Sequence, residues 1–171
     1  MIWEISHRSE DRARQIADRH YNRQKVGSQQ FVPPGRCLVL YAKTAAGQAF
    51  WVTSWPYAEY AFHAWAGAWM CSAFRNEGAG VASDMIRQAV AATRAYWGEP
   101  PALGMVTFID RGKVKPIMAR GQATYGRTYE LAGFRPVGET KQAKLLALQL
   151  LPDAMPPPEH CRGGQPALVF G

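Results

Sequence analysis

The chain has 171 residues, 47% of them hydrophobic and 12% aromatic, which suits one compact domain with a buried core. Lysine and arginine outnumber aspartate and glutamate by 20 to 13, and the formal net charge of +7 favours a polyanionic partner, although many basic proteins bind only a small anionic ligand. No apolar run reaches the roughly 18 to 20 residues of a membrane helix and the N-terminus turns charged at once, so we expect a cytoplasmic protein with no membrane span and no signal peptide.

The cysteines show no pattern of a structural site. Cys37, Cys71 and Cys161 are odd in number, lie far apart and form no CxxC pair. This spacing argues against a disulfide framework and against a structural zinc site, so we expect three reduced thiols.

The N-terminal third predicts a helix, a long loop and then a hairpin. Apolar positions between Ser9 and Tyr21 recur at helical spacing, with charged residues on the other side. Segment 22–36 is polar and contains prolines and glycines, so it cannot continue that helix. Segments 36–43 and 48–55 are rich in β-branched and aromatic residues and predict two antiparallel strands.

The middle of the chain predicts a strand, a helix and another strand. Segment 68–74 is the first of these strands, and apolar residues from Val81 to Trp97 follow one side of a helix that Gly98 ends. Segment 103–110 is a nearly continuous apolar run, which is typical of a strand covered on both faces. We therefore expect it to be central in the sheet.

The last third predicts a loop, a short helix and a final strand. Segment 111–127 is basic and has no clear periodicity, so it is expected to be a mobile loop. Residues 128–134 predict the helix and residues 144–151 the strand. A single domain, 1–152, is then followed by an extended, proline- and glycine-rich tail, 153–171. This order of elements predicts a mixed α/β (α+β) fold with a mainly antiparallel sheet flanked by helices.

A glycine-containing turn connects the strand at 68–74 to the helix that follows it. Arg75, Gly78 and Gly80 form the pattern R-x-x-G-x-G in this turn. Glycines let the backbone turn sharply and expose successive N–H groups, to which the helix N-terminus adds partial positive charge, so the turn could cradle a diphosphate. The pattern matches neither the Walker motif nor the dinucleotide-binding motif, and a plain tight turn is the alternative.

In its context this turn resembles that of the GNAT acyltransferase superfamily. The strand, the R-x-x-G-x-G pattern and the long helix are followed by an apolar strand, the sequence YELAGF and a closing strand, over about Trp69 to Leu151. The resemblance implies a GNAT-like fold in which Arg75, Gly78 and Gly80 bind the pyrophosphate of acetyl-CoA or of a related acyl-CoA.

Four segments carry a narrower resemblance. RHY at 19–21, FRNEG at 74–78, TFID at 107–110 and TYELAGF at 128–134, in this order and at these distances, are similar to the phage Mom family. Those proteins have a GNAT-like fold and convert adenine in duplex DNA to N6-(carbamoylmethyl)adenine, which protects phage DNA from host restriction. The resemblance implies an active site lined by His20, Tyr21, Arg75, Asp110 and Tyr129.

The basic segment 111–127 is longer than the family pattern leads us to expect. It could be a loop that contacts DNA, or the position matched to Tyr129 could be shifted, which makes Tyr125 a second candidate. The donor of the added group is also open between an acyl-CoA and chemistry at an iron centre. For iron, His20, Tyr21 and Asp110 are the candidate ligands, together with Tyr129.

Modification of adenine N6 requires an electrophile beside the exocyclic amine and a base that takes up a proton. Asp110, at the end of a buried strand, is the candidate base or hydrogen-bond acceptor, and a turn or cap residue is its alternative role. Arg75 could bind a diphosphate or a DNA phosphate, or it could form an ion pair with Glu77 or Asp84.

The N6 amine of duplex DNA lies within the base stack, so the enzyme must turn the base out and hold it between aromatic faces. Most aromatic residues here are expected to be in the core, which is also the alternative for His20 and Tyr21. Phosphate contacts are expected from Arg23, Lys25 and Arg36 and from segment 111–127. The candidates for stacking are Trp51, Trp55, Tyr57, Trp65 and Trp69.

Taken together, these patterns predict an enzyme: a Mom-like, GNAT-fold transferase that acts on adenine in double-stranded DNA in the host cytoplasm. The first alternative is a conventional GNAT N-acetyltransferase that uses acetyl-CoA to modify an amine of a small molecule or a protein. The second is a GNAT-like DNA-binding module whose cofactor turn is degenerate. A homodimer is one possible assembly.

Overall fold

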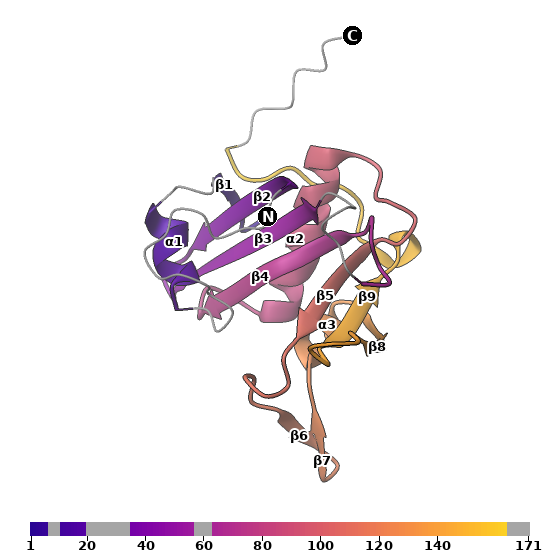
Figure 1. Ribbon diagram of the computed structural model, residues 1–171. Helices are drawn as coiled ribbons and strands as arrows, with labels where there is room; N and C mark the ends of the chain where they lie inside the picture. Colours follow the sequence, from indigo (N-terminus) through magenta and orange to yellow (C-terminus); the bar gives the residue numbers. More distant parts are fainter. Residues whose placement is uncertain (7–10, 20–34, 57–62, 164–171) are drawn as a thin grey trace.

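The computed structural model describes residues 1–6, 11–19, 35–56 and 63–163 (Figure 1). The strands in this part of the chain are β1 (Glu4–Ser6), β2 (Gly35–Lys43), β3 (Gln48–Pro56), β4 (Trp69–Glu77), β5 (Met105–Ile109), β6 (Ile117–Ala119), β7 (Gln122–Thr124), β8 (Arg135–Glu139) and β9 (Leu146–Leu150). The helices are α1 (Asp11–Ala17), α2 (Ala82–Trp97), α3 (Arg127–Leu131) and the short 3-10 helix η2 (Pro152–Ala154).

Seven strands form one sheet in the order β1-β2-β3-β4-β5-β9-β8, and β6 and β7 form a separate hairpin. All neighbours in the large sheet are antiparallel except β4 and β5. β4 and β5 are parallel, and α2 forms the crossover connection that parallel neighbours require. The predicted mixed α/β fold with a mainly antiparallel sheet is therefore confirmed.

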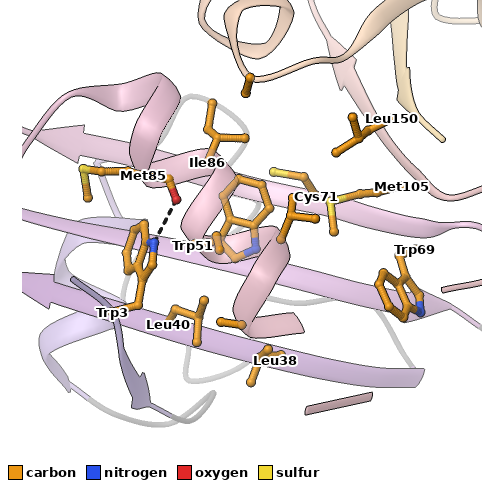
Figure 2. Close-up of a cluster of buried hydrophobic side chains, with 14 of the residues drawn as sticks. Trp3, Leu38, Leu40, Trp51, Trp69, Cys71, Met85, Ile86, Met105 and Leu150 are labelled. Atoms are coloured by element: carbon orange, nitrogen blue, oxygen red, sulfur yellow. Dashed lines mark hydrogen bonds between the residues drawn. The ribbon is translucent and has the colours of Figure 1, made fainter. Parts of the chain in front are cut away.

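The two faces of the sheet are covered by different helices. On one face the apolar side of α2, which includes Met85 and Ile86, packs against buried sheet residues such as Trp51 (Figure 2). The indole of Trp3 donates a hydrogen bond to the Met85 carbonyl over 2.9 Å and so ties the N-terminal segment to α2. On the other face α1 buries Ile16 and its neighbours in a smaller cluster.

The strongly periodic segments were predicted correctly. Segments 36–43 and 48–55 form the β2–β3 hairpin, and segment 81–97 forms α2 with Val81 as its N-cap residue and Gly98 as its C-cap residue. Segment 103–110 contains β5, which lies between β4 and β9 and is almost wholly buried, as expected of a central strand. The first helix is described from Asp11 to Ala17, with a turn that reaches Arg19.

Segment 111–127 is not the loop that was predicted. Within it β6 and β7 pair as a hairpin, connected by Arg120 and Gly121. The prediction was wrong because each strand has only three residues, nearly all exposed, so the sequence has no alternation of buried and exposed positions. Two edge strands, β1 and β8, were not predicted either; β8 is exposed along its whole length and contains a proline and a glycine.

The described part of the predicted tail, which ends at residue 163, begins in η2 and packs against the domain well beyond residue 152. Met155 and Cys161 are buried in the main core. The guanidinium of Arg94 donates to the Pro156 carbonyl over 2.8 Å, and the Arg162 amide donates to the Trp3 carbonyl over 3.0 Å. Residues 155–162 are thus part of the same packed unit as the sheet.

None of the three cysteines forms a disulfide. None of the described helices combines the length and the apolar character that crossing a membrane would require.

Candidate functional site

The parallel strands β4 and β5 separate part of the way along their length. They are paired at three positions, of which the last joins Cys71 to Thr107. On the other side of β4, the register with β3 shifts so that Thr53 is opposite Cys71 and Val52 is opposite Ala73. Ser72 is therefore an extra residue in a β-bulge, and its hydroxyl forms a hydrogen bond with that of Ser54. The bulge bends β4 away from β5 and opens a space between them.

A cavity of about 250 Å³ occupies this space. Its walls come from β4 at and around the bulge, from β5, from the first residue of α2, from the base of the β6–β7 hairpin and from α3. The wall is partly apolar, through residues such as Phe74 and Ile109. Polar and charged side chains also contribute, and they include Ser72, Thr107, Lys115, Arg127, Thr128 and Tyr129.

Tyr129 and Cys71 face each other inside the cavity. The Tyr129 hydroxyl lies 3.6 Å from the Cys71 sulfur, and the Tyr129 ring is held edge-on against Phe134. Burial raises the pKa of the Cys71 thiol to about 12, and the hydrogen bonds from Tyr129 and Thr107 only partly offset that effect. The thiol is therefore protonated at neutral pH, and the Tyr129 hydroxyl lies beside it in the cavity wall.

Hydrogen bonds of the Asn76 side chain stabilise the glycine turn. Gly78 has φ of 84°, which favours glycine, and the Asn76 side chain accepts from the Ala79 amide and donates to the Gly80 carbonyl. No side chain caps the start of α2, whose first residue, Ala82, lines the cavity. The turn thus directs the positive end of the α2 dipole toward the cavity.

Arg75 lies on the opposite face of the sheet, beside the end of α1. Its Nε donates to Glu77 over 2.8 Å and its terminal nitrogen donates to the Arg19 carbonyl over 2.9 Å. Arg19 also binds Glu77 through two nitrogens, at 2.8 and 2.6 Å. These hydrogen bonds, first from Arg19 and then from Arg75, lower the pKa of Glu77 to about 2. Arg75 thus forms the ion pair with Glu77 that was one of its predicted alternative roles. It is not among the residues that line the cavity.

Asp110 follows β5 and opens a turn. Its carboxylate accepts a hydrogen bond from the Gly112 amide over 2.9 Å and lies 3.8 Å from the Lys113 ammonium. The side chain is 34% exposed and lies outside the cavity wall. The structure therefore gives Asp110 the turn position that was the alternative to a catalytic base.

An aromatic cluster lies on the sheet face opposite α2, next to the split between the strands. The Phe108 ring lies 4.9 Å from that of His63 and 5.9 Å from that of Trp65, and all three are half-buried. Phe108 also lines the cavity. Burial lowers the pKa of His63, whose Nδ1 accepts the Trp65 amide over 3.1 Å. This imidazole is therefore neutral at pH 7 and adds a flat, uncharged face.

The other aromatic candidates are placed differently. Trp51 and Trp69 are fully buried, so neither can stack on a ligand. Trp55 packs with Trp69 and Trp97, and Arg36 lies over the rings of both Trp55 and Trp97.

Several predicted site residues lie outside the described part of the chain. They are His20, Tyr21, Arg23, Lys25 and Tyr57. In the described ranges, no group of three or more histidine, cysteine, aspartate or glutamate side chains could hold a metal ion. The candidate iron ligands within these ranges are Asp110 and Tyr129, of which only Tyr129 lines the cavity. Tyr125, the second candidate for the position of Tyr129, packs against the main core.

The sequence indicated Tyr129, the glycine turn and Trp65 but missed other residues of the site. Cys71, Thr107 and Phe108 were assigned only to strands, because their role depends on where β4 and β5 separate. Comparison with protein-family models, curated protein sequences and solved structures returned no match.

Proposed function

We propose that the protein is a GNAT-like group-transfer enzyme that modifies adenine in double-stranded DNA, as the Mom resemblance implies. The observation that carries the proposal is the cavity at the split between β4 and β5, which is bounded by the start of α2 and by a basic hairpin. A donor entering from the α2 side and a base approaching from the opposite face would meet in this split.

The donor side suits an anionic group. Lys115 and Arg127 line the cavity, and the uncapped start of α2 adds partial positive charge. Arg127 is partly compensated by Glu130 at 3.8 Å, and Asp84 in the first turn of α2 already complements the helix dipole, so Lys115 is the main local cation. This arrangement favours a donor such as an acyl-CoA, with its pyrophosphate outside the cavity and its reactive arm inside.

Tyr129 is the residue that we assign to the transfer step. If N6 attacks the acyl carbon of a thioester, the new C–N bond forms as the C–S bond breaks, and the leaving thiolate needs a proton. The Tyr129 hydroxyl, inside the cavity, can supply that proton, and solvent can take up the proton that N6 loses. This step gives an N6-acyladenine, whereas the carbamoylmethyl group that the Mom resemblance implies is bonded to N6 through a methylene carbon. That product requires N6 to attack a methylene carbon that carries the leaving group, so that the new C–N bond forms as the bond to the leaving group breaks, and Tyr129 can supply a proton to that leaving group in the same way.

The base side has a flat surface. Duplex adenine must leave the stack to react, and an extruded base needs an aromatic face. The cluster of His63, Trp65 and Phe108 supplies one at the edge of the cavity.

Mass spectrometry of nucleosides tests the proposal. Plasmid DNA from bacteria that express the protein is digested, and a deoxyadenosine carrying the added group is expected for the wild type and strongly reduced in Tyr129→Phe. Tyr96→Phe is the matched control, because Tyr96 is exposed and remote from the cavity wall. Unmodified adenine from cells that contain abundant folded wild-type protein would refute the proposal.

The alternative is a conventional N-acetyltransferase that acts on a small amine or a protein. The closeness of the cavity to the start of α2 supports this alternative as well as the proposed function, because it favours acetyl-CoA binding whether or not the second substrate is DNA. Calorimetric titration with acetyl-CoA, paired with a duplex-binding assay, separates the two: acetyl-CoA binding without duplex affinity indicates the alternative. If Asp110→Asn combined with Tyr129→Phe leaves both duplex affinity and biological protection unchanged, the protein is a DNA-binding module.

A further inference from the structure

We infer that the β6–β7 hairpin enters the major groove of duplex DNA, with Arg120 at its tip contacting base edges. The inference rests on the proposed DNA substrate and assigns to this hairpin the element that reads it.

The hairpin is connected directly to the candidate site. It projects from the body of the domain below β5 and α3 (Figure 1). Its base is the pair Ile117 and Thr124, and both residues line the cavity. Thr124 also donates its hydroxyl proton to the Ile117 carbonyl over 2.8 Å, which holds the base of the hairpin closed. A duplex bound along the hairpin would therefore present its bases next to the cavity.

The charge of the hairpin segment is of one sign. Residues 111–127 contain five basic residues and no aspartate or glutamate. Three of the five are paired with carboxylates outside the segment or at its edge: Arg111 with Glu139, Lys113 with Asp110 and Arg127 with Glu130. Within the described ranges, Lys115 near the base of the hairpin and Arg120 at its tip have no ion-pair partner. The uncompensated charges thus lie near the base and at the tip of the hairpin, where a polyanion bound along it would meet both.

Arg120 occupies a backbone conformation that does not suit it. Arg120 has φ of 51° and Gly121 has φ of 76°, and these two residues alone connect Ala119 to Gln122. Two-residue hairpin turns with both φ values positive favour Asn-Gly, because asparagine tolerates the left-handed region better than arginine does. Folding of the turn therefore does not explain an arginine at this position, whereas use of its guanidinium does.

The shape and the other side chains of the hairpin fit the major groove. A two-stranded ribbon fits this groove, and an arginine there can donate two hydrogen bonds to a guanine edge. Ile117 and Met118 are 53% and 64% exposed, and such apolar side chains can contact thymine methyl groups. Adenine N6 also lies at the major-groove edge, so the groove that the hairpin enters carries the target atom.

The test compares Arg120→Asn with Arg120→Lys by fluorescence anisotropy on a labelled duplex, at several salt concentrations. We expect Arg120→Asn to weaken duplex binding about tenfold or more while the thermal midpoint stays the same or rises, since asparagine suits the turn. Arg120→Lys should keep the salt dependence but lose part of the affinity, because it keeps the charge and loses the planar fork. Methyl green, a major-groove ligand, should compete with the wild type, and netropsin, a minor-groove ligand, should not.

Arg162→Asn is the matched control. It removes the same charge from an exposed position next to β1, at the opposite end of the sheet, and should leave binding unchanged. If the wild type binds duplex DNA and Arg120→Asn binds as tightly, or if netropsin competes instead of methyl green, the inference about the hairpin fails and the proposed function stands. A wild type with no duplex affinity overturns both.

Discussion

The hydroxyl of Tyr129 lies 3.6 Å from the sulfur of Cys71, across the gap between α3 and the bulged part of β4. The contact joins two segments that are 58 residues apart in sequence, and both of its residues line the cavity. One partner is a thiol that burial keeps protonated, and the other is the phenol to which we assign the proton transfer.

Tyr129→Phe should lower the rate of transfer about 10²-fold, because it removes the proposed proton donor. The ring and its edge-on contact with Phe134 are kept, so the free energy of unfolding should change by about 1 kcal/mol or less. Single-turnover rates and urea unfolding measure the two effects. Tyr125→Phe is the control; if it lowers the rate and Tyr129→Phe does not, the roles of the two tyrosines are reversed.

The stability of the protein should fall as the pH rises above 9. The pKa of the buried Cys71 thiol is about 12, against an ordinary value of 9.0, so between these two values the unfolded chain releases a proton that the folded chain keeps. The contribution of this burial is fully present below pH 9 and is lost as the pH approaches 12. Urea midpoints from pH 8 to pH 11 should decline less steeply in Cys71→Ala than in the wild type. Equal slopes would contradict the assignment. Cys37→Ala, at a half-buried thiol outside the cavity, is the control.

The opposite pH dependence is expected from Glu77. Its pKa of about 2 lies below the ordinary 4.5, so the folded carboxylate, bound by Arg19 and Arg75, contributes stability that is present above pH 4.5 and is lost as the pH falls toward 2. Glu77→Gln should therefore flatten the acid side of the stability curve. Thermal midpoints at pH 3 and pH 6 measure this, with Glu99→Gln as an exposed control. The two variants should differ in slope, and identical slopes would mean that the triad with Arg19 and Arg75 is absent in solution.

The two glycines of the R-x-x-G-x-G turn should respond differently to alanine. Gly78 has φ of 84°, and a Cβ there would meet the Ala46 carbonyl oxygen at 3.3 Å, so Gly78→Ala should cost about 1 to 2 kcal/mol of unfolding free energy. A Cβ on Gly80 would make only ordinary contacts at 3.5 Å, with Ile2 and Met85 side chains. Gly80→Ala should therefore change stability by less than about 0.5 kcal/mol. Urea unfolding of both variants checks the difference.

Trp65→Ala should raise KM for duplex DNA and have a smaller effect on the free energy of unfolding. Removal of one stacking face costs about 1 to 3 kcal/mol per base by analogy with single-strand binding, so KM for DNA should rise about tenfold. Trp65→Phe keeps an aromatic face and should recover most of the loss. If both variants modify DNA as the wild type does, the cluster with His63 and Phe108 has only a packing role.

Local patterns were enough to predict much of the fold. Apolar residues at helical spacing predicted α2 between Val81 and Trp97, and β-branched runs predicted β2 and β3, because each of these elements buries a face that its own sequence marks. The β6–β7 hairpin buries almost no side chains, so its sequence shows no alternation of apolar and polar residues. Its turn has Arg120 at a position that favours asparagine, so the turn could not be predicted from the usual Asn-Gly pattern.

The site was harder to predict than the fold because it depends on contacts between distant segments. The motif around Arg75 pointed to a phosphate, but the side chain faces α1 and pairs with Glu77. Tyr129 was predicted through resemblance, and its partner Cys71 was not. The sequence of β4 alone does not show where its pairing with β5 ends.

The position of Ser72 as the extra residue of the β4 bulge matters more than its side chain. The extra residue in β4 changes which side chains face each helix: Cys71 faces the α2 core, and after the bulge Phe74 does so, while Arg75 and Glu77 reach α1. Deletion of this one residue would make Cys71 and Ala73 neighbours, opposite Thr53 and Val52 as they already are, so β4 would lose the bulge while Arg75 and Glu77 stayed on the α1 face. Regular pairing of Ser72 with β3, without the bulge, would instead reverse the alternation and turn the two charged side chains toward Trp3 and Trp51. Deletion of Ser72 should thus keep the core and close the space beside β5, whereas a substitution that keeps the bulge should keep both.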